Sequence, residues 1–440
     1  MRGVMLFITG LLSLAGIGLY VLLADRAADA GDEQSVELRA YTHRVGTFYG
    51  PAPGASGVRV TIRELELPLF AGANAIWGAS GRDDQGHLWF GVSVQDEKSA
   101  RLIEYLPQQD RFVDHGDPVT ALETHGLARD GTRQVKIHSK IIQADDGHLY
   151  FSSMDEEGES HKTGALPHWG SNLWRYKPRE SRWEHVFHAP EGLIAIAGVG
   201  RWIYALGYWD HVLYQYDTRT GRVSHIRVGS EGGHVSRNII ADINGHVYVP
   251  RLKYYDMPED AATGSDESHR LLVATLMEYD TKLRVVNTFP LIHYVGDGRP
   301  LKYHGITAFS HMADHSIVFV TGTGYLYRII PANDGPAGVE ELGWIHPEGE
   351  SYTAALFPLD GQEWLLGVGK HRARGKRGGG QYQVVLYNLR QRTSRTVPAQ
   401  IPDYRYLLLY GSNTRDDRAN SYLVGRVDWK TPIVWQLHVE

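Results

Sequence analysis

Four side chains at predicted strand ends have the types that proton-transfer chemistry on an acidic sugar requires: His138, Tyr208, Arg237 and Arg251. The C5 proton of a uronate is weakly acidic until the neighbouring carboxylate is neutralised, and an Arg guanidinium can bind both carboxylate oxygens. A His or Tyr can then remove the proton, and a second such group can protonate the departing glycosidic oxygen. The predicted chemistry is therefore β-elimination, with His138 as base, Tyr208 as acid or alternative base, and Arg237 or Arg251 as the carboxylate neutraliser.

Other polar residues are predicted to lie on the same face and to bind an acidic polysaccharide. They are His168, His304, Lys370, Arg372, Arg374 and Arg426. The stretch KHRARGKRGGG, residues 370–380, carries five Lys or Arg side chains in its first eight residues, a density that attracts polyanions. We find no pair of facing carboxylates at strand ends, which disfavours ordinary two-carboxylate glycoside hydrolysis.

Cofactor motifs are few in this sequence. The chain has 22 His, so imidazoles from several strands could converge on a divalent metal, but no close-spaced motif such as HExxH identifies the ligands. The sequence requires no cofactor and does not identify metal ligands. It also lacks a G-x-S-x-G elbow, a Walker loop and a dinucleotide fingerprint, so neither serine hydrolysis nor nucleotide use is predicted.

A repeated phrase identifies the elements that must position these residues. DDQGHLWFGVS from Asp83, DDGHLYFSS from Asp145 and DINGHVYVPR from Asp242 each place a polar turn before an alternating strand, and four weaker copies make seven. A second phrase, such as VLYQYDTRTGRV, adds two further strands to each copy. Seven such units predict an all-β chain that folds as a seven-bladed β-propeller.

The final copy, PIVWQLHVE, is one strand short, whereas VRVTIREL at residues 58–65 has no partner of its own. Pairing of these two segments is predicted to close the ring and leave no sheet edge exposed. The longest connections, residues 154–168, 252–270 and 370–380, all join the second and third strands of a blade, so they share one face. Inner strands begin on that face and second strands end there, and functional residues are expected on it. The candidates placed at these strand ends are His138, Arg237, His304, Tyr208, Arg251, Lys370 and Arg426.

Composition and the N-terminus restrict the cellular setting. The formal net charge of -6 and the absence of a basic stripe disfavour nucleic-acid binding, and the absence of Cys excludes disulfides and thiolate metal sites. An uncharged run from Gly3 to Ala24 follows Arg2, so residues 1–30 are either a signal peptide or a membrane anchor. Residues 31–57 are then a linker and residues 58–440 the propeller. Both alternatives predict an exported chain, periplasmic, extracellular or held at the membrane by its N-terminus.

The repeats resemble two groups of propeller proteins. NLWRYKPRESRWE and VLYQYDTRTGRV are similar to repeats of secreted propellers of the streptogramin B lyase type, over most of the chain, and this likeness concerns the fold. HSKIIQADDGHLYFSS resembles the seven-bladed polysaccharide lyases that act on ulvan and related polyuronides. That resemblance implies His138 as the first catalytic histidine. The family's second catalytic histidine would fall near residues 154–156, where this sequence has no histidine. His161 or His168 on the longer loop would then have to take its place.

Two other functions stay open at the level of sequence. A non-catalytic propeller could bind carbohydrate or serve as a scaffold in an envelope-associated complex, for which an uncleaved anchor is natural. Elimination on a small molecule, as in streptogramin lyases, would instead need a deep and closed pocket.

Overall fold

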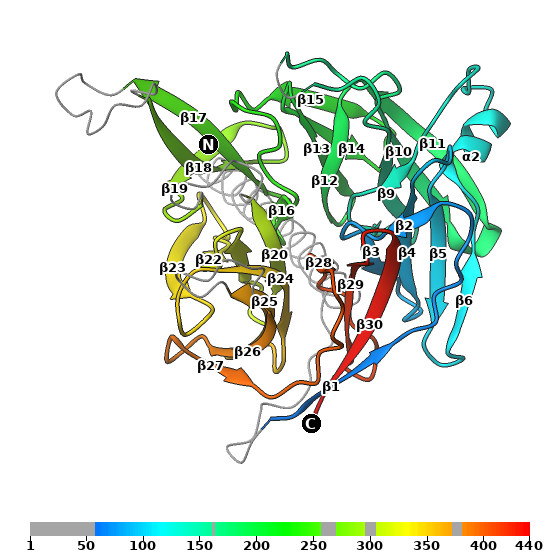
Figure 1. Cartoon of the computed structure of the whole chain (residues 1–440). Helices are drawn as coiled ribbons and strands as arrows, with labels where there is room; N and C mark the ends of the chain where they lie inside the picture. The colour runs from blue at the N-terminus through cyan, green and yellow to red at the C-terminus, as the bar shows by residue number, and fades with distance from the viewer. Residues whose placement is uncertain (1–57, 161–162, 257–269, 295–304, 372–380) are drawn as a thin grey trace, which may run out of the picture.

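The computed structural model describes residues 58–160, 163–256, 270–294, 305–371 and 381–440 as seven antiparallel sheets arranged in a ring (Figure 1). This confirms the all-β, seven-bladed propeller that the repeats predict. We number the blades in chain order, and each runs from an inner strand near the axis to an outer strand. The predicted N-terminal signal peptide or anchor and the linker lie outside the described residues.

The strand bounds follow the repeats. Blade 1 contains β2 (Ala73–Ala75), β3 (Ser80–Arg82), β4 (Leu88–Val94), β5 (Arg101–Leu106) and β6 (Arg111–Asp114). Blade 2 contains β7 (Lys136–Ile137), β8 (Ile142–Gln143), β9 (Leu149–Met154), β10 (Ser171–Lys177) and β11 (Arg182–Ala189). Blade 3 contains β12 (Gly192–Val199), β13 (Trp202–Tyr208), β14 (Val212–Asp217) and β15 (Val223–Arg227). Blade 4 contains β16 (Ile240–Ala241), β17 (Val247–Asp256), β18 (Arg270–Tyr279) and β19 (Val285–Pro290).

The remaining blades have four strands each. Blade 5 contains β20 (Ile306–His311), β21 (Ile317–Thr321), β22 (Tyr325–Ile330) and β23 (Gly338–Trp344). Blade 6 contains β24 (Ser351–Pro358), β25 (Trp364–His371), β26 (Tyr382–Asn388) and β27 (Thr393–Val397). Blade 7 contains β28 (Leu407–Tyr410), β29 (Ser421–Val427), β30 (Thr431–Val439) and β1 (Val60–Glu64).

The ring is closed by the N-terminal strand, as predicted. β1 pairs antiparallel with β30, with Val60 opposite Val439 and Glu64 opposite Trp435 (Figure 1). Side chains reinforce the backbone pairing, because Glu64 Oε2 accepts hydrogen bonds from Trp435 Nε1 at 2.9 Å and from the Tyr404 hydroxyl at 2.6 Å. β1 is therefore the outermost strand of blade 7, and it covers the edge that β30 would otherwise expose.

The repeated DxxGH phrase is a structural device at the inner hairpin turn. In blade 1 Asp83 accepts hydrogen bonds from the backbone N–H groups of Gln85 and His87 and from Trp89 Nε1. His87 Nδ1 then lies 2.7 Å from Glu104 Oε1 on the third strand. The phrase therefore recurs because one carboxylate satisfies the turn and one histidine joins the hairpin to the rest of the blade.

Blade 4 repeats this arrangement and extends it to its neighbour. Asp242 caps the turn at His246, whose Nδ1 lies 2.7 Å from Oε1 of the fully buried Glu278. Glu278 also accepts from the backbone N–H of Ala337, in the connection between β22 and β23 of blade 5. A buried carboxylate is thus fully hydrogen-bonded between two blades, as burial of a charge requires.

Connections differ in length on the two faces, as the sequence predicts. The C-terminal ends of β9, β17 and β25 and the N-terminal ends of β10, β18 and β26 lie on one face, which we call the loop face. Two strands run further toward this face than the sequence predicts: β17 extends to Asp256 and β25 extends to His371. The short helix α2 (Pro118–Thr124) begins after the N-cap Asp117 between blades 1 and 2, and a 3-10 turn, Pro178–Glu180, connects β10 to β11. Among the described residues, no helix combines the length and apolar character needed to span a bilayer.

Candidate functional site

Four inner strands bring side chains of very different type to the same level around the axis. In blades 1, 2, 4 and 7 the hairpin turn is marked by a backbone hydrogen bond from Asp83, Ala144, Asp242 or Asp416. When the four blades are aligned on these turn residues, the position six residues earlier is structurally equivalent in each blade. The four equivalent residues are Trp77, His138, Ser236 and Tyr410. Repetition of the blade therefore places a Trp, a His and a Tyr side by side although they are far apart in sequence.

These residues form the centre of a contact network that we call the axial cluster. It consists of Trp77, Lys136, His138, Arg237, Tyr410 and Arg426. The Trp77 ring is stacked parallel to His138 at 6.1 Å between centroids and lies 4.8 Å from the Tyr410 ring. Three cations surround these rings: Lys136 Nζ lies 5.1 Å and Arg426 Cζ 4.6 Å from Trp77, and Arg237 Cζ lies 5.1 Å from Tyr410.

His138 lies in a break of the inner strand rather than at its start, which corrects the expected position. His138 directly follows β7, in the gap between β7 and β8. In this gap the Ser139 hydroxyl accepts a 2.8 Å hydrogen bond from the Ser152 backbone N–H and so replaces a backbone partner of the ladder. Burial lowers the pKa of His138 well below its ordinary value, and the charges of Lys136 and Arg237 lower it further. The imidazole is therefore neutral at neutral pH and has a lone pair available to accept a proton.

Tyr208 ends β13 and is joined to His138 through His234. The His234 ring lies 6.5 Å from His138 and 5.0 Å from Tyr208 between centroids. The Tyr208 hydroxyl donates a 2.7 Å hydrogen bond to Glu159 Oε2, on the loop between β9 and β10. Burial, followed by the negative charges of Glu156 and Glu159, strongly raises the pKa of Tyr208. The phenol therefore stays protonated in the free protein, and the raised pKa also makes it a weaker acid than an ordinary tyrosine.

Several donors of the axial cluster are buried without a protein partner. Arg237 Nη1, Arg426 Nε and Trp77 Nε1 have no hydrogen-bond partner among the described residues. Leaving a buried donor unpaired is costly, so such atoms are natural places for a ligand oxygen or an ordered water. Lys136 differs, because its ammonium is 2.5 Å from Glu156 Oε2.

Lys140 is a buried lysine with a structural role. Its Nζ donates to the carbonyl oxygen of Gly411, the residue after Tyr410, and burial lowers its pKa to about 7. This contact joins blade 2 to blade 7 directly beside the axial cluster. Ser412 is structural in the same sense, because its hydroxyl lies 3.1 Å from that of Ser80.

The structure brings together only some of the predicted site residues. His138, Tyr208, Arg237 and Arg426 lie in or beside the axial cluster, whereas no contact among the described residues joins Arg251 to it. Lys370 Nζ lies 5.4 Å from the Tyr382 ring in blade 6, and His168 is exposed on the loop between β9 and β10. His161, His304, Arg372 and Arg374 lie outside the described residues.

Four residues of the site were missed by the sequence analysis: Trp77, Lys136, His234 and Tyr410. Trp77 and Tyr410 could have been found by aligning the repeats on the hairpin turn and reading six positions back. His234 precedes Arg237 by three residues in GGHVSRN, but nothing local distinguishes it from a loop histidine. Lys136 carries no signal, because a strand-start Lys is ordinarily solvated.

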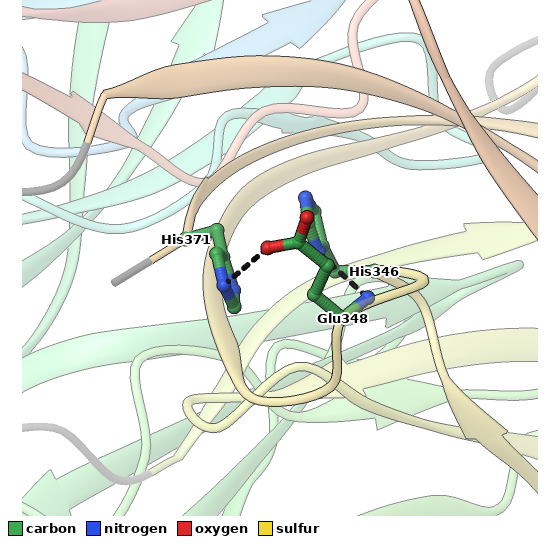
Figure 2. Close-up of side chains that lie close together, drawn as sticks. All are labelled: His346, Glu348 and His371. Atoms are coloured by element: carbon green, nitrogen blue, oxygen red, sulfur yellow. Dashed lines mark hydrogen bonds and ion pairs between the residues drawn. The ribbon is translucent and has the colours of Figure 1, made fainter. Parts of the chain in front are cut away.

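Among the described residues, two groups of His and carboxylate side chains have the composition of metal ligands. Asp83, His87 and Glu104 are engaged by the hairpin turn described above. His346, Glu348 and His371 lie on the loop face between blades 5 and 6 (Figure 2). A separate cavity of about 380 Å³ lies on the opposite face, lined by turn residues of blades 1 and 2 such as Asp84, Asp145 and Lys177. It is remote from the axial cluster.

Comparisons with known proteins find similar folds. No family model and no curated protein matches the chain. The extracellular domain of BT4673 from B. thetaiotaomicron is 14% identical with a TM-score of 0.49, and the match covers 84% of this chain but only 39% of that one. U3-55K is 9% identical with a TM-score of 0.48, over 88% of this chain and 99% of that one.

An oligogalacturonate lyase from Vibrio parahaemolyticus is 10% identical with a TM-score of 0.45, over 89% of this chain and 98% of that one. At such identities and TM-scores, none of these likenesses bears on what this chain binds or transforms. The evidence for its function is the site itself, in a chain whose fold is a seven-bladed β-propeller.

Proposed function

We propose that this chain binds an acidic polysaccharide on the loop face and cleaves it by β-elimination at a uronic acid residue. One observation carries the proposal: a neutral imidazole, a protonated phenol and guanidinium groups with unpaired buried donors belong to a single contact network. Elimination at a uronate needs a base, an acid and a carboxylate neutraliser, and each has a candidate here.

Arg237 is the proposed carboxylate neutraliser. Its buried Nη1 has no partner among the described residues, so a uronate carboxylate would satisfy a donor that is otherwise unpaired. Binding by the guanidinium withdraws charge from the carboxylate and makes the C5 proton more acidic. Lys136 adds a second positive charge nearby, because it lowers the pKa of His138 as Arg237 does.

His138 is the proposed base. It takes the C5 proton, the electrons of the C5–H bond form the C4–C5 double bond, and the C4–O bond breaks. In the free protein its low pKa keeps it neutral but makes it a weak base. A bound carboxylate would offset the charges of Lys136 and Arg237, raise the pKa of His138 and strengthen the base only when substrate is present.

Tyr208 is the proposed acid. Its raised pKa keeps the phenol protonated, and it donates to Glu159 in the free protein. In the reaction the phenolic proton passes to the glycosidic oxygen that leaves C4, and His138 and Tyr208 return to their starting states by exchange with water. His234, which contacts both rings, is suited to position them.

Following absorbance near 230 nm tests the proposal, because elimination creates an unsaturated uronate that absorbs there. Purified protein is incubated with ulvan, alginate, pectate and glucuronan, with and without divalent metal. We expect a rise with at least one polymer and its loss in His138→Ala, while His225→Ala, an exposed blade 3 histidine, behaves as wild type. Absence of a rise with every polymer would exclude the lyase.

A non-catalytic carbohydrate-binding propeller is the second candidate, and one surface favours it. Trp429 is 61% exposed, is stacked on Tyr406 at 3.4 Å between centroids, and borders Arg426 at 5.6 Å. Its backbone and that of Asp428 are held at positive φ, an uncommon conformation for residues other than Gly. Polymer binding that Trp429→Ala removes, without any absorbance change in wild type, would support this candidate instead.

A further inference from the structure

His346, Glu348 and His371 converge where blades 5 and 6 meet on the loop face (Figure 2). His346 follows β23, Glu348 lies two residues later in a tight turn, and His371 is the last residue of β25. A 3.0 Å backbone hydrogen bond from Gly349 to the His346 carbonyl closes the turn, with Gly349 at a φ of 96°. One ligand atom from each side chain lies within 4.8 Å of the others.

The hydrogen bonds of the two histidines fix which nitrogens carry protons. His371 Nδ1 lies 3.1 Å from the Glu350 carbonyl oxygen, which can only accept, so Nδ1 bears the hydrogen. His346 Nδ1 accepts from the Glu348 backbone N–H at 3.1 Å, so its hydrogen is on Nε2, 2.6 Å from Gln383 Oε1. Each neutral ring therefore has a lone pair on the atom nearer to Glu348.

The contact between His371 and Glu348 needs a cation. His371 Nε2 lies 2.9 Å from Glu348 Oε2, and in the neutral tautomer both atoms are acceptors. Either a proton or a metal ion must lie between them. The two imidazoles are also stacked, 4.3 Å apart and 3° from parallel, so a charge on both rings would be unfavourable.

We propose that His346 Nδ1, Glu348 and His371 Nε2 bind a divalent transition metal, with zinc as the best match. Two imidazoles and one carboxylate are the ligands of many zinc sites that keep open positions. The Glu350 carbonyl and Gln383 accept the remaining ring N–H groups, which is the usual support for metal-binding histidines. On binding, one of the two stacked rings must rotate out of parallel so that both lone pairs meet at the ion, and His346 Nδ1 exchanges the bond from Glu348 N–H for the metal.

The open coordination positions face solvent. Glu348 is 69% exposed at its side chain, whereas His371 is 13% exposed, so water or an external oxygen ligand can complete the coordination from the Glu348 side. The site belongs to blades 5 and 6 and shares no residue with the axial cluster. Its existence is therefore independent of the proposed lyase activity.

Metal retention after dialysis tests the site. Tag-free protein is stripped with chelator, loaded with Zn²⁺, dialysed and assayed for bound zinc, and Co²⁺ loading is followed by its visible absorbance. We expect His371→Ala and Glu348→Gln each to lose one zinc equivalent relative to wild type and to lose the Co²⁺ band. His225→Ala, which removes an exposed histidine of blade 3, keeps both.

A variant outside the ligand set separates coordination from folding. Gln383→Leu keeps all three ligands but removes the acceptor for His346 Nε2–H, so zinc affinity should fall about 10- to 100-fold. Glu348→Gln changes an exposed side chain, so its circular dichroism should equal that of wild type. Equal zinc in wild type, His371→Ala and Glu348→Gln would overturn the site, whatever the outcome of the lyase assay.

Discussion

Replacing Tyr208 with Phe tests the proposed acid while keeping the ring in place. Tyr208 is 3% exposed, and among the described residues its hydroxyl makes one hydrogen bond, which it donates at 2.7 Å to the partly exposed Glu159. The substitution removes that one hydrogen bond and leaves Glu159 accessible to water, so the free energy of unfolding should fall by only about 1 kcal/mol. Losing a general acid should lower kcat by about 10²- to 10⁴-fold.

Tyr204 on the same strand supplies the matched control. It is buried and donates a 2.6 Å hydrogen bond to the Gly245 carbonyl, at the far end of β13 from Tyr208. Tyr204→Phe should therefore cost a similar amount of stability, about 1–2 kcal/mol, and leave kcat unchanged. Initial rates at 230 nm with the best polyuronide, and thermal melts of both variants, measure the two quantities. A Tyr208→Phe enzyme that keeps more than a tenth of wild-type kcat would refute the assignment of Tyr208 as acid.

Three further predictions concern pH, the inter-blade network and ring closure. Because Lys136 lowers the pKa of His138, Lys136→Met should raise that pKa and move the acid limb of the kcat/KM profile to higher pH; an unmoved limb would contradict His138 as base. Glu278→Leu should cost about 3–5 kcal/mol in urea unfolding, because it leaves buried donors unpaired. The raised pKa of His246 means that its contribution to stability is complete below its unfolded pKa, near 6.5, and is lost as pH rises through the folded value; melts at pH 6 and 9 should reveal this in wild type and not in the variant. Deleting β1 (Val60–Glu64) should expose β30 and cause self-association in size-exclusion chromatography, and a monodisperse product with unchanged Tm would argue against its closing role.

The sequence predicts much of the site because a propeller repeats one unit around an axis. Once the hairpin turns are aligned, the ends of inner and second strands must share a face, which is why His138, Tyr208, Arg237 and Arg426 are found there together. Arg251 was expected at such a strand end, but β17 continues to Asp256, and no contact among the described residues joins Arg251 to the axial cluster. A strand end fixes the face of the ring, whereas the direction of the side chain depends on packing against the neighbouring blade.

The sequence by itself determines the repeated hairpins, the seven-bladed ring, its closure by the N-terminal strand and the face with the long loops. These features follow from turn chemistry and period-two alternation, which are local. Only the tertiary structure decides which side chains meet: Trp77, His138 and Tyr410 come from blades 1, 2 and 7, which closure of the ring makes neighbours. The same holds for His346 and His371, whose rings stack because two blades pack together. Burial among these partners sets the protonation states of His138 and Tyr208, and no local pattern encodes it.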